Sequence, residues 1–139
     1  MNLFDPFQPR HRHSNPQIRI EAVKLLADQT IIAKVARRDS EPDVRRAAIE
    51  RLTDKETLIR IAQCHRKPDV RMTAIQGLTD QAVLAEIAKR DSHSSVRETA
   101  VARVTDQVVL AEIAKSDSYW RVREKAIERL TDQASSLRS

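Results

Sequence analysis

The segments TDQAVLAEIAK (residues 79–89) and TDQVVLAEIAK (residues 105–115) differ at one position and begin 26 residues apart. The same spacing separates the residues that open five successive units: Pro16, Pro42, Pro68, Ser94 and Trp120. No insertion interrupts this period. The spacing predicts internal repeats, each a supersecondary unit that buries its apolar face against its neighbours.

Each 26-residue unit contains two apolar patterns of helical period. In residues 69–78 the apolar side chains recur at i, i+4, i+5 and i+8, which places them on one side of a helix. Residues 81–89 carry a second stripe, preceded by Asp80 as a candidate N-cap, with Thr79 as the alternative. The first helices of the units are predicted over residues 17–26, 43–52, 69–78, 95–104 and 121–130. The second helices are predicted over residues 29–37, 55–64, 81–89 and 107–115.

The composition agrees with an all-helical chain. Only one of the 139 residues is glycine and aromatic residues are 3%, so the apolar material is mainly Ala, Val, Ile and Leu. An all-β fold, a phosphate-binding loop and a dinucleotide-binding loop each need more glycine than this. Because neither helix of a unit is long enough to be stable alone in water, we predict stacking. The expected fold is an all-α, right-handed α-solenoid of antiparallel helix pairs with about nine helices.

The repeat resembles the short HEAT-like repeat of the phycobilisome-lyase type, through its order of Asp, a turn, Pro-x-Val-Arg and then spaced Ala and Leu. A weaker resemblance is to the leucine-rich-repeat-variant family. The HEAT resemblance implies a ladder between a turn aspartate and an arginine six positions later. It assigns three structural pairs: Asp39 with Arg45, Asp91 with Arg97, and Asp117 with Arg123. Before Arg71 the aspartate is replaced by His65, so the rung at Arg71 is expected to be weak.

Both ends of the chain depart from the repeat. We expect an irregular basic segment over residues 1–14, a solenoid over 15–134 and a tail over 135–139. Phe4 and Phe7 either belong to a mobile segment or fold back over the first repeat. At the other end, Ser136 takes the place of a core leucine, which predicts that the last half-repeat is frayed or forms a polar cap.

No residue pattern indicates catalysis, a metal or a cofactor. The chain has one cysteine, Cys64, and four histidines without the spacing of a metal site. No apolar run approaches the ~18 residues of a membrane span. We therefore expect no catalytic, metal or cofactor residues, no membrane insertion and a cytoplasmic location.

A binding surface is predicted on the Pro-started helices, on the arc opposite their apolar stripe. In HEAT-like stacks this helix lines the concave side, so its outward positions are expected to line a groove. The middle of this row is small and neutral, and its C-terminal end is acidic through Glu98, Glu124 and Glu128. The candidate partner-binding residues are Arg46, Ala47, Glu50, Met72, Thr73, Gln76, Glu98, Thr99, Ala102, Tyr119 and Trp120.

These observations favour a non-catalytic scaffold or adaptor that binds a peptide or helix of another protein. The net charge of +5 leaves nucleic-acid binding as an alternative. That alternative would use the basic residues near the N-terminus: Arg10, Arg12, Arg37, Arg38, Arg45 and Arg46. A lyase-like or cofactor-chaperone role is the third hypothesis, and it rests only on the resemblance. For Trp120 two roles stay open, a cover over the C-terminal edge of the core or a partner contact.

Overall fold

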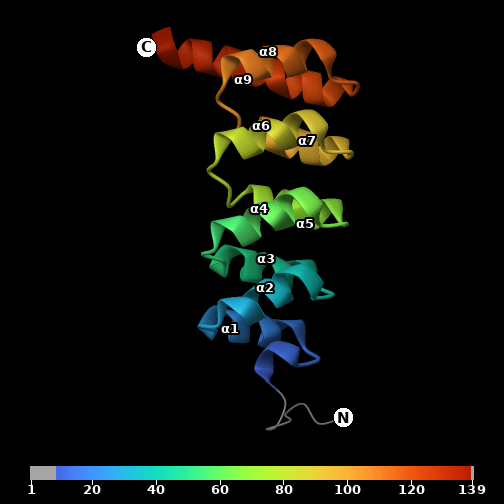
Figure 1. Cartoon of the computed structure of the whole chain (residues 1–139), viewed down its shortest axis with the longest axis vertical. Helices are drawn as coiled ribbons and strands as arrows, with labels where there is room; N and C mark the ends of the chain where they lie inside the picture. The colour runs from blue at the N-terminus through green and yellow to red at the C-terminus, as the bar shows by residue number, and fades with distance from the viewer. Residues whose placement is uncertain (1–8, 139) are drawn as a thin grey trace.

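The computed structural model describes residues 9–138. Within this range the chain forms nine α-helices and a short 3-10 helix, with no strand. The elements are η1 (Arg10–Arg12), α1 (Pro16–Leu25), α2 (Gln29–Arg38), α3 (Pro42–Arg51), α4 (Lys55–Cys64), α5 (Pro68–Ile75), α6 (Gln81–Arg90), α7 (Ser94–Val101), α8 (Gln107–Ser116) and α9 (Trp120–Arg138). Figure 1 shows them stacked along one axis, with α1 and α9 at opposite ends of the stack. The predicted all-α solenoid of helix pairs is confirmed, and its right-handed sense stays a prediction.

The helix boundaries follow from the capping residues read in the sequence. The carboxylates of Asp28, Asp80 and Asp106 each accept two backbone N–H groups at the start of the following helix. At α6 (Gln81–Arg90), Asp80 rather than Thr79 is therefore the cap. The odd-numbered helices α1, α3 and α5 begin with proline. Proline lacks the backbone N–H, and at the first position of a helix this group would have no helical carbonyl to bond.

The core is one continuous cluster that runs from Val23 in α1 to Ala126 in α9. Alanines such as Ala48, Ala74 and Ala100 are fully buried, which lets adjacent helices approach closely. Leu78 is 3% exposed, as the repeat pattern predicts. The odd-numbered helices form one layer, in which each contacts the next along the stack, and the even-numbered helices form the other layer.

The last repeat differs from the expectation. A helix over residues 121–130 and a tail over residues 135–139 were expected, but α9 continues to Arg138 as one helix. Elsewhere the second helix folds back because its apolar residues reach the core. Here Ser135 and Ser136 stand where α6 has Val83 and Leu84, so folding back would bury nothing apolar. Figure 1 shows the end of α9 extending beyond the side of the stack.

The described part of the N-terminal segment, residues 9–14, packs against the first repeat. The 3-10 helix η1 contacts α1, and Arg19 donates from Nη1 to the carbonyls of His13 (2.7 Å) and Ser14 (3.0 Å). These six residues therefore pack against α1, and the expected irregular segment over residues 1–14 stays a prediction. The alternatives for Phe4 and Phe7 lie outside the described residues.

Candidate functional site

From here on, a repeat means the two helices on either side of one turn, such as α2 with α3, and not the unit that opens at a proline. Arginines on the odd-numbered helices link each repeat to the next. In three of them, Nε and Nη2 donate to the two carboxylate oxygens of an aspartate 20 residues later, at 2.9–3.1 Å. The three pairs are Arg19 with Asp39, Arg71 with Asp91, and Arg97 with Asp117. Both side chains of each pair are nearly buried, so each rung is a shielded, bidentate ion pair between neighbouring repeats.

The pairing expected within a single repeat is therefore wrong. Arg45 donates to the backbone carbonyl of Asp39 (2.7 Å), while the carboxylate of Asp39 receives the arginine of the preceding repeat. The Asp39 carboxylate also accepts the N–H of Glu41, and this bond turns the carboxylate away from Arg45. The remaining expected pairs show the same carbonyl contact: Arg97 to Asp91 and Arg123 to Asp117.

The weakened rung belongs to Arg45, not to Arg71. Twenty residues after Arg45 stands His65, whose ring Nδ1 accepts the N–H of Lys67 and whose Nε2 donates to the carbonyl of Arg37 at 2.8 Å. Arg45 turns instead to Asp69 at 2.8 Å, whose side chain is 57% exposed, against 6% for Asp91. The expectation at Arg71 is wrong because the ladder runs forward to the next repeat.

A second set of links joins the opposite ends of these helices. Arginine Nη2 groups cap a free carbonyl at the end of the preceding odd-numbered helix. The contacts run from Arg51 to Leu26, from Arg103 to Leu78 and from Arg129 to Val104. Glutamines add a third set, since Gln29 bonds Arg51 O and Thr53 N, and Gln81 bonds Arg103 O and Thr105 N.

All three kinds of link are altered at one place, where α3 and α4 meet α5 and α6. We call this place the central junction. His65 replaces the ladder aspartate, Gly77 replaces the capping arginine and Lys55 replaces the glutamine. In a regular repeat, the arginine that Gly77 replaces would cap the carbonyl of Leu52. Within residues 9–138 no group donates a hydrogen bond to that carbonyl.

The central junction carries a cavity of about 630 Å³ on the odd-helix side, which we call the central groove. Six of the residues predicted to bind a partner line it: Arg46, Glu50, Met72, Thr73, Gln76 and Thr99. The residues that sequence reasoning missed are Ile49, Leu52, Leu58 and Gly77. The available signal was the chain's single glycine at a position held by arginine in other repeats.

Five predicted partner-binding residues do not line the central groove. Ala47 and Glu98 lie on α3 and α7 outside the groove, and Ala102 directly follows α7. Trp120 is the first residue of α9, and Tyr119 directly precedes it. Trp120 is 54% exposed, with the guanidinium of Arg121 5.4 Å from its ring centroid. About half of the indole is therefore covered, and both roles left open for Trp120 stay predictions.

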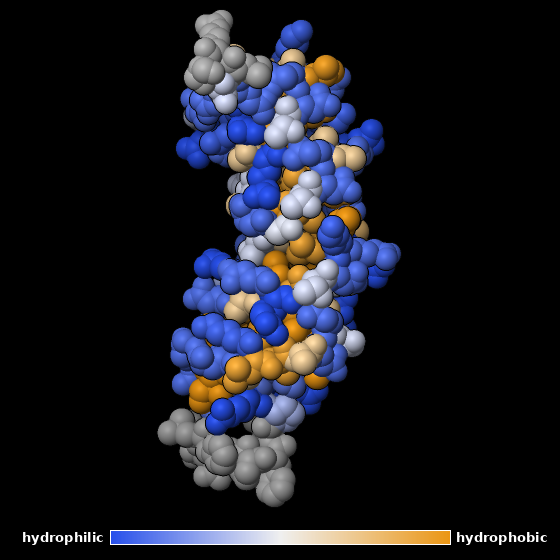
Figure 2. Space-filling model, turned by 90° about the vertical axis from the view of Figure 1, so that its left-hand side faces the viewer, coloured by the Kyte–Doolittle hydropathy of each residue, from blue (hydrophilic) through white to orange (hydrophobic). Residues whose placement is uncertain are grey.

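A smaller cavity of about 440 Å³ lies beside the central groove at the same junction. We call it the turn cavity because the turns before α4 and α6 line it, including Asp54 and Asp80. It shares Leu52, Leu58 and Gly77 with the central groove. Figure 2 looks onto the edge of the stack that carries these turns and shows apolar side chains exposed along it between polar ones.

The basic residues near the N-terminus serve different roles. Arg12 and Arg38 line a cavity of about 720 Å³ with Lys34. Burial, followed by the charges of Arg12 and Lys34, lowers the pKa of His11 at this cavity. Arg45 is buried and ion-paired, so it is not available to a phosphate group.

In residues 9–138 no three His, Cys, Asp or Glu side chains gather as a metal site would require. Cys64 is exposed at the end of α4. No helix in this range has the length and apolar character needed to cross a membrane.

The repeat architecture agrees with a comparison to known families. A family profile described as HEAT repeat associated with sister chromatid cohesion matches residues 24–52 and 76–101. The protein is a HEAT-like repeat protein. No curated protein and no solved structure matches the chain significantly. The phycobilisome-lyase subtype of this HEAT-like protein stays a prediction. HEAT repeats generally mediate protein–protein interaction and are typically non-catalytic.

Proposed function

We propose that this HEAT-like protein is a scaffold that binds a peptide or helix of another protein in the central groove. The observation that carries this proposal is the groove of about 630 Å³ lined by α3, α5 and α7 residues. Its position coincides with the outward row of the odd-numbered helices. A cavity of this size accommodates one or two side chains of a bound segment.

The chemistry of the groove favours a mixed apolar and polar segment. Ile49, Leu58 and Met72 provide apolar contact, and methionine adapts its shape to different partners. Arg46 and Glu50 at one side provide charges of both signs, and Thr73 and Thr99 provide hydroxyl groups at the other. Such a surface suits an amphipathic helix with one apolar residue directed into the cavity.

The layer packing supports the choice of this face. The odd-numbered helices contact their neighbours along the stack more closely than the even-numbered helices do. A solenoid that curves with its odd-numbered helices on the concave side would show this difference. The arrangement also disfavours the nucleic-acid alternative, because Arg45 is engaged in the ladder and the groove lacks a run of basic residues.

The proposal is tested by site-specific photo-cross-linking in the source cells. A photoreactive p-benzoylphenylalanine replaces Thr73 in the groove, or Glu86 on the exposed side of α6 as the matched control. We expect a cross-linked protein with the probe at position 73 and none at position 86. Cross-linking at position 86 alone, or at neither position, contradicts the proposal.

A further inference from the structure

The turn cavity has the form of an empty arginine site. At the other junctions of the odd-numbered helices an arginine of the chain itself occupies the equivalent place. Arg103 donates from Nη2 to the carbonyl of Leu78 at 2.7 Å, and Arg129 donates to Val104 at 2.9 Å. At the central junction Gly77 provides no side chain, and the cavity of about 440 Å³ lies beside the Leu52 carbonyl.

The charge around this cavity is that of a cation site. Leu52 ends α3, so its carbonyl belongs to the negative end of the helix dipole. Two acidic residues, Asp54 and Asp80, line the same cavity. A hydrogen bond from the Thr57 hydroxyl holds the pKa of Asp54 below its usual range, so Asp54 is ionised at neutral pH.

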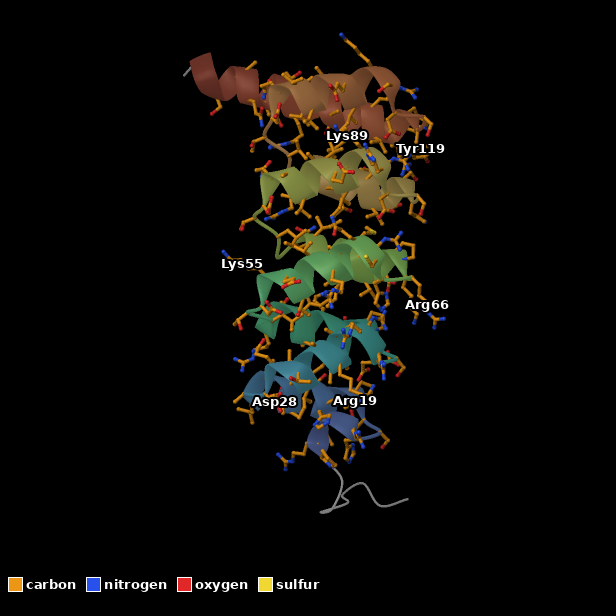
Figure 3. All side chains as sticks on the ribbon, viewed as in Figure 1. Arg19, Asp28, Lys55, Arg66, Lys89 and Tyr119 are labelled. Carbon is orange, nitrogen blue, oxygen red and sulfur yellow. The ribbon has the colours of Figure 1, made fainter. Side chains whose placement is uncertain are left out.

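Lysine at position 55 does not fill the place of the missing arginine. Lys55 is exposed and makes no ion pair within residues 9–138, and Figure 3 shows its side chain pointing away from the stack. In the next repeat, Gln81 bonds the carbonyl of Arg103 and the N–H of Thr105. Lys55 stands in place of this glutamine, so the equivalent groups, the Gly77 carbonyl and the Thr79 N–H, lack that partner. The cavity therefore offers two carbonyl acceptors and two carboxylates.

We propose that the partner protein inserts an arginine side chain into the turn cavity, where its guanidinium donates to the Leu52 carbonyl. This inference rests on the proposed function, because the turn cavity and the central groove share Leu52, Leu58 and Gly77. One bound segment can thus place an apolar residue in the groove and an arginine in the turn cavity. Arginine fits better than lysine because its planar fork reaches a carbonyl and a carboxylate together.

The test uses the full chain labelled with ¹⁵N and the small probe Nα-acetyl-arginine methylamide. Titration is followed through the amide signals of Thr53, Gly77 and Thr79. We expect saturable shifts at these residues, and at least tenfold weaker binding of the matching lysine compound. Absence of saturable shifts, or equal binding of the lysine compound, overturns the proposal.

Two variants at equivalent repeat positions sharpen this test. In Gly77→Arg the chain supplies its own arginine, so probe binding should fall at least tenfold. The added Cβ lies 3.0 Å from Leu58 Cδ2, a tight contact that the end of the Leu58 side chain relieves by shifting a few tenths of an ångström. In Arg103→Gly the Leu78 carbonyl is freed, and a second set of shifts should arise near Thr105. Unchanged binding in the first variant together with no new site in the second contradicts the proposal.

The outcome separates this inference from the proposed function. If cross-linking from position 73 captures a partner whose affinity is unchanged by Gly77→Arg, the groove binds but the arginine site is wrong. If the probe binds in the turn cavity while position 73 captures nothing, the cavity takes arginine but the proposed partner groove is wrong.

Discussion

The guanidinium of Arg71 binds both carboxylate oxygens of Asp91 in the next repeat, with Nε–Oδ2 and Nη2–Oδ1 distances of 2.9 Å. The same arginine donates from Nη1 to the carbonyl of His65, in the turn of its own repeat. One side chain thus fixes its own turn and the following turn together. Arg45 keeps the contact to the carbonyl of its own turn, at Asp39, but lacks a buried carboxylate in the following turn.

Replacing Arg71 should destabilise the protein more than replacing Arg45. Arg71→Ala leaves the nearly buried Asp91 without its counter-ion, at an expected cost of about 1–3 kcal/mol. Arg45→Ala leaves Asp69, which water already solvates. The turn-carbonyl contact is common to both, so it cancels in the comparison. Chemical denaturation measures both costs, and an equal loss would count against the forward ladder.

Restoring the missing rung should stabilise the protein. His65→Asp places a carboxylate 20 residues after Arg45, where Asp91 stands relative to Arg71. We expect a gain of about 1 kcal/mol, reduced by loss of the His65 bond to the Arg37 carbonyl. His65→Asn serves as the uncharged control and should gain less. A lower unfolding midpoint for His65→Asp than for the natural chain would refute this assignment.

The inter-repeat core should be sensitive to truncation at Leu78. Leu78→Ala removes a side chain that is 3% exposed, so we expect a cost of about 2–5 kcal/mol. Because each repeat depends on its neighbours, unfolding can also lose its two-state character. Leu25→Ala is the matched control, since Leu25 is 82% exposed and should change stability by less than about 0.5 kcal/mol. Similar melting curves for both variants would mean that Leu78 does not hold the core.

Removal of the exposed indole should leave stability intact. Trp120 is 54% exposed, so Trp120→Ala should shift the free energy of unfolding by less than about 0.5 kcal/mol. The natural protein should also show red-shifted, readily quenched tryptophan emission, since Trp120 is its single tryptophan. Stability lost on the scale of a core residue would instead assign Trp120 to covering the edge of the solenoid.

The repeat pattern carried enough information to predict the helices. Apolar spacing, capping aspartates and prolines act within about ten residues, so helix positions such as α4 over Lys55–Cys64 follow from local rules. The row containing Met72 and Thr73 was predictable for the same reason, because helical period decides which side chains point outward.

The links between repeats depend on geometry that the period does not contain. Asp91 can pair with Arg97, six residues later in the chain, or with Arg71, 20 residues earlier. Only the orientation of the turn shows that Arg71 is its partner. The lining residues around Gly77 were missed because they are uncovered by the absence of an arginine side chain at that position. Apolar spacing does not reveal a missing side chain. The continuous α9 was missed because whether a helix folds back depends on what its second half can bury.

The affinity of the cross-linked partner for variants of the central groove tests the central claim most directly. Thr73→Arg fills the groove, and Glu86→Arg makes the same kind of change on the opposite layer. Calorimetric titration should show at least tenfold weaker binding for Thr73→Arg, with Glu86→Arg unchanged and both variants equally folded by circular dichroism. Equal affinity of Thr73→Arg and the natural protein for the partner would contradict a binding site in this groove.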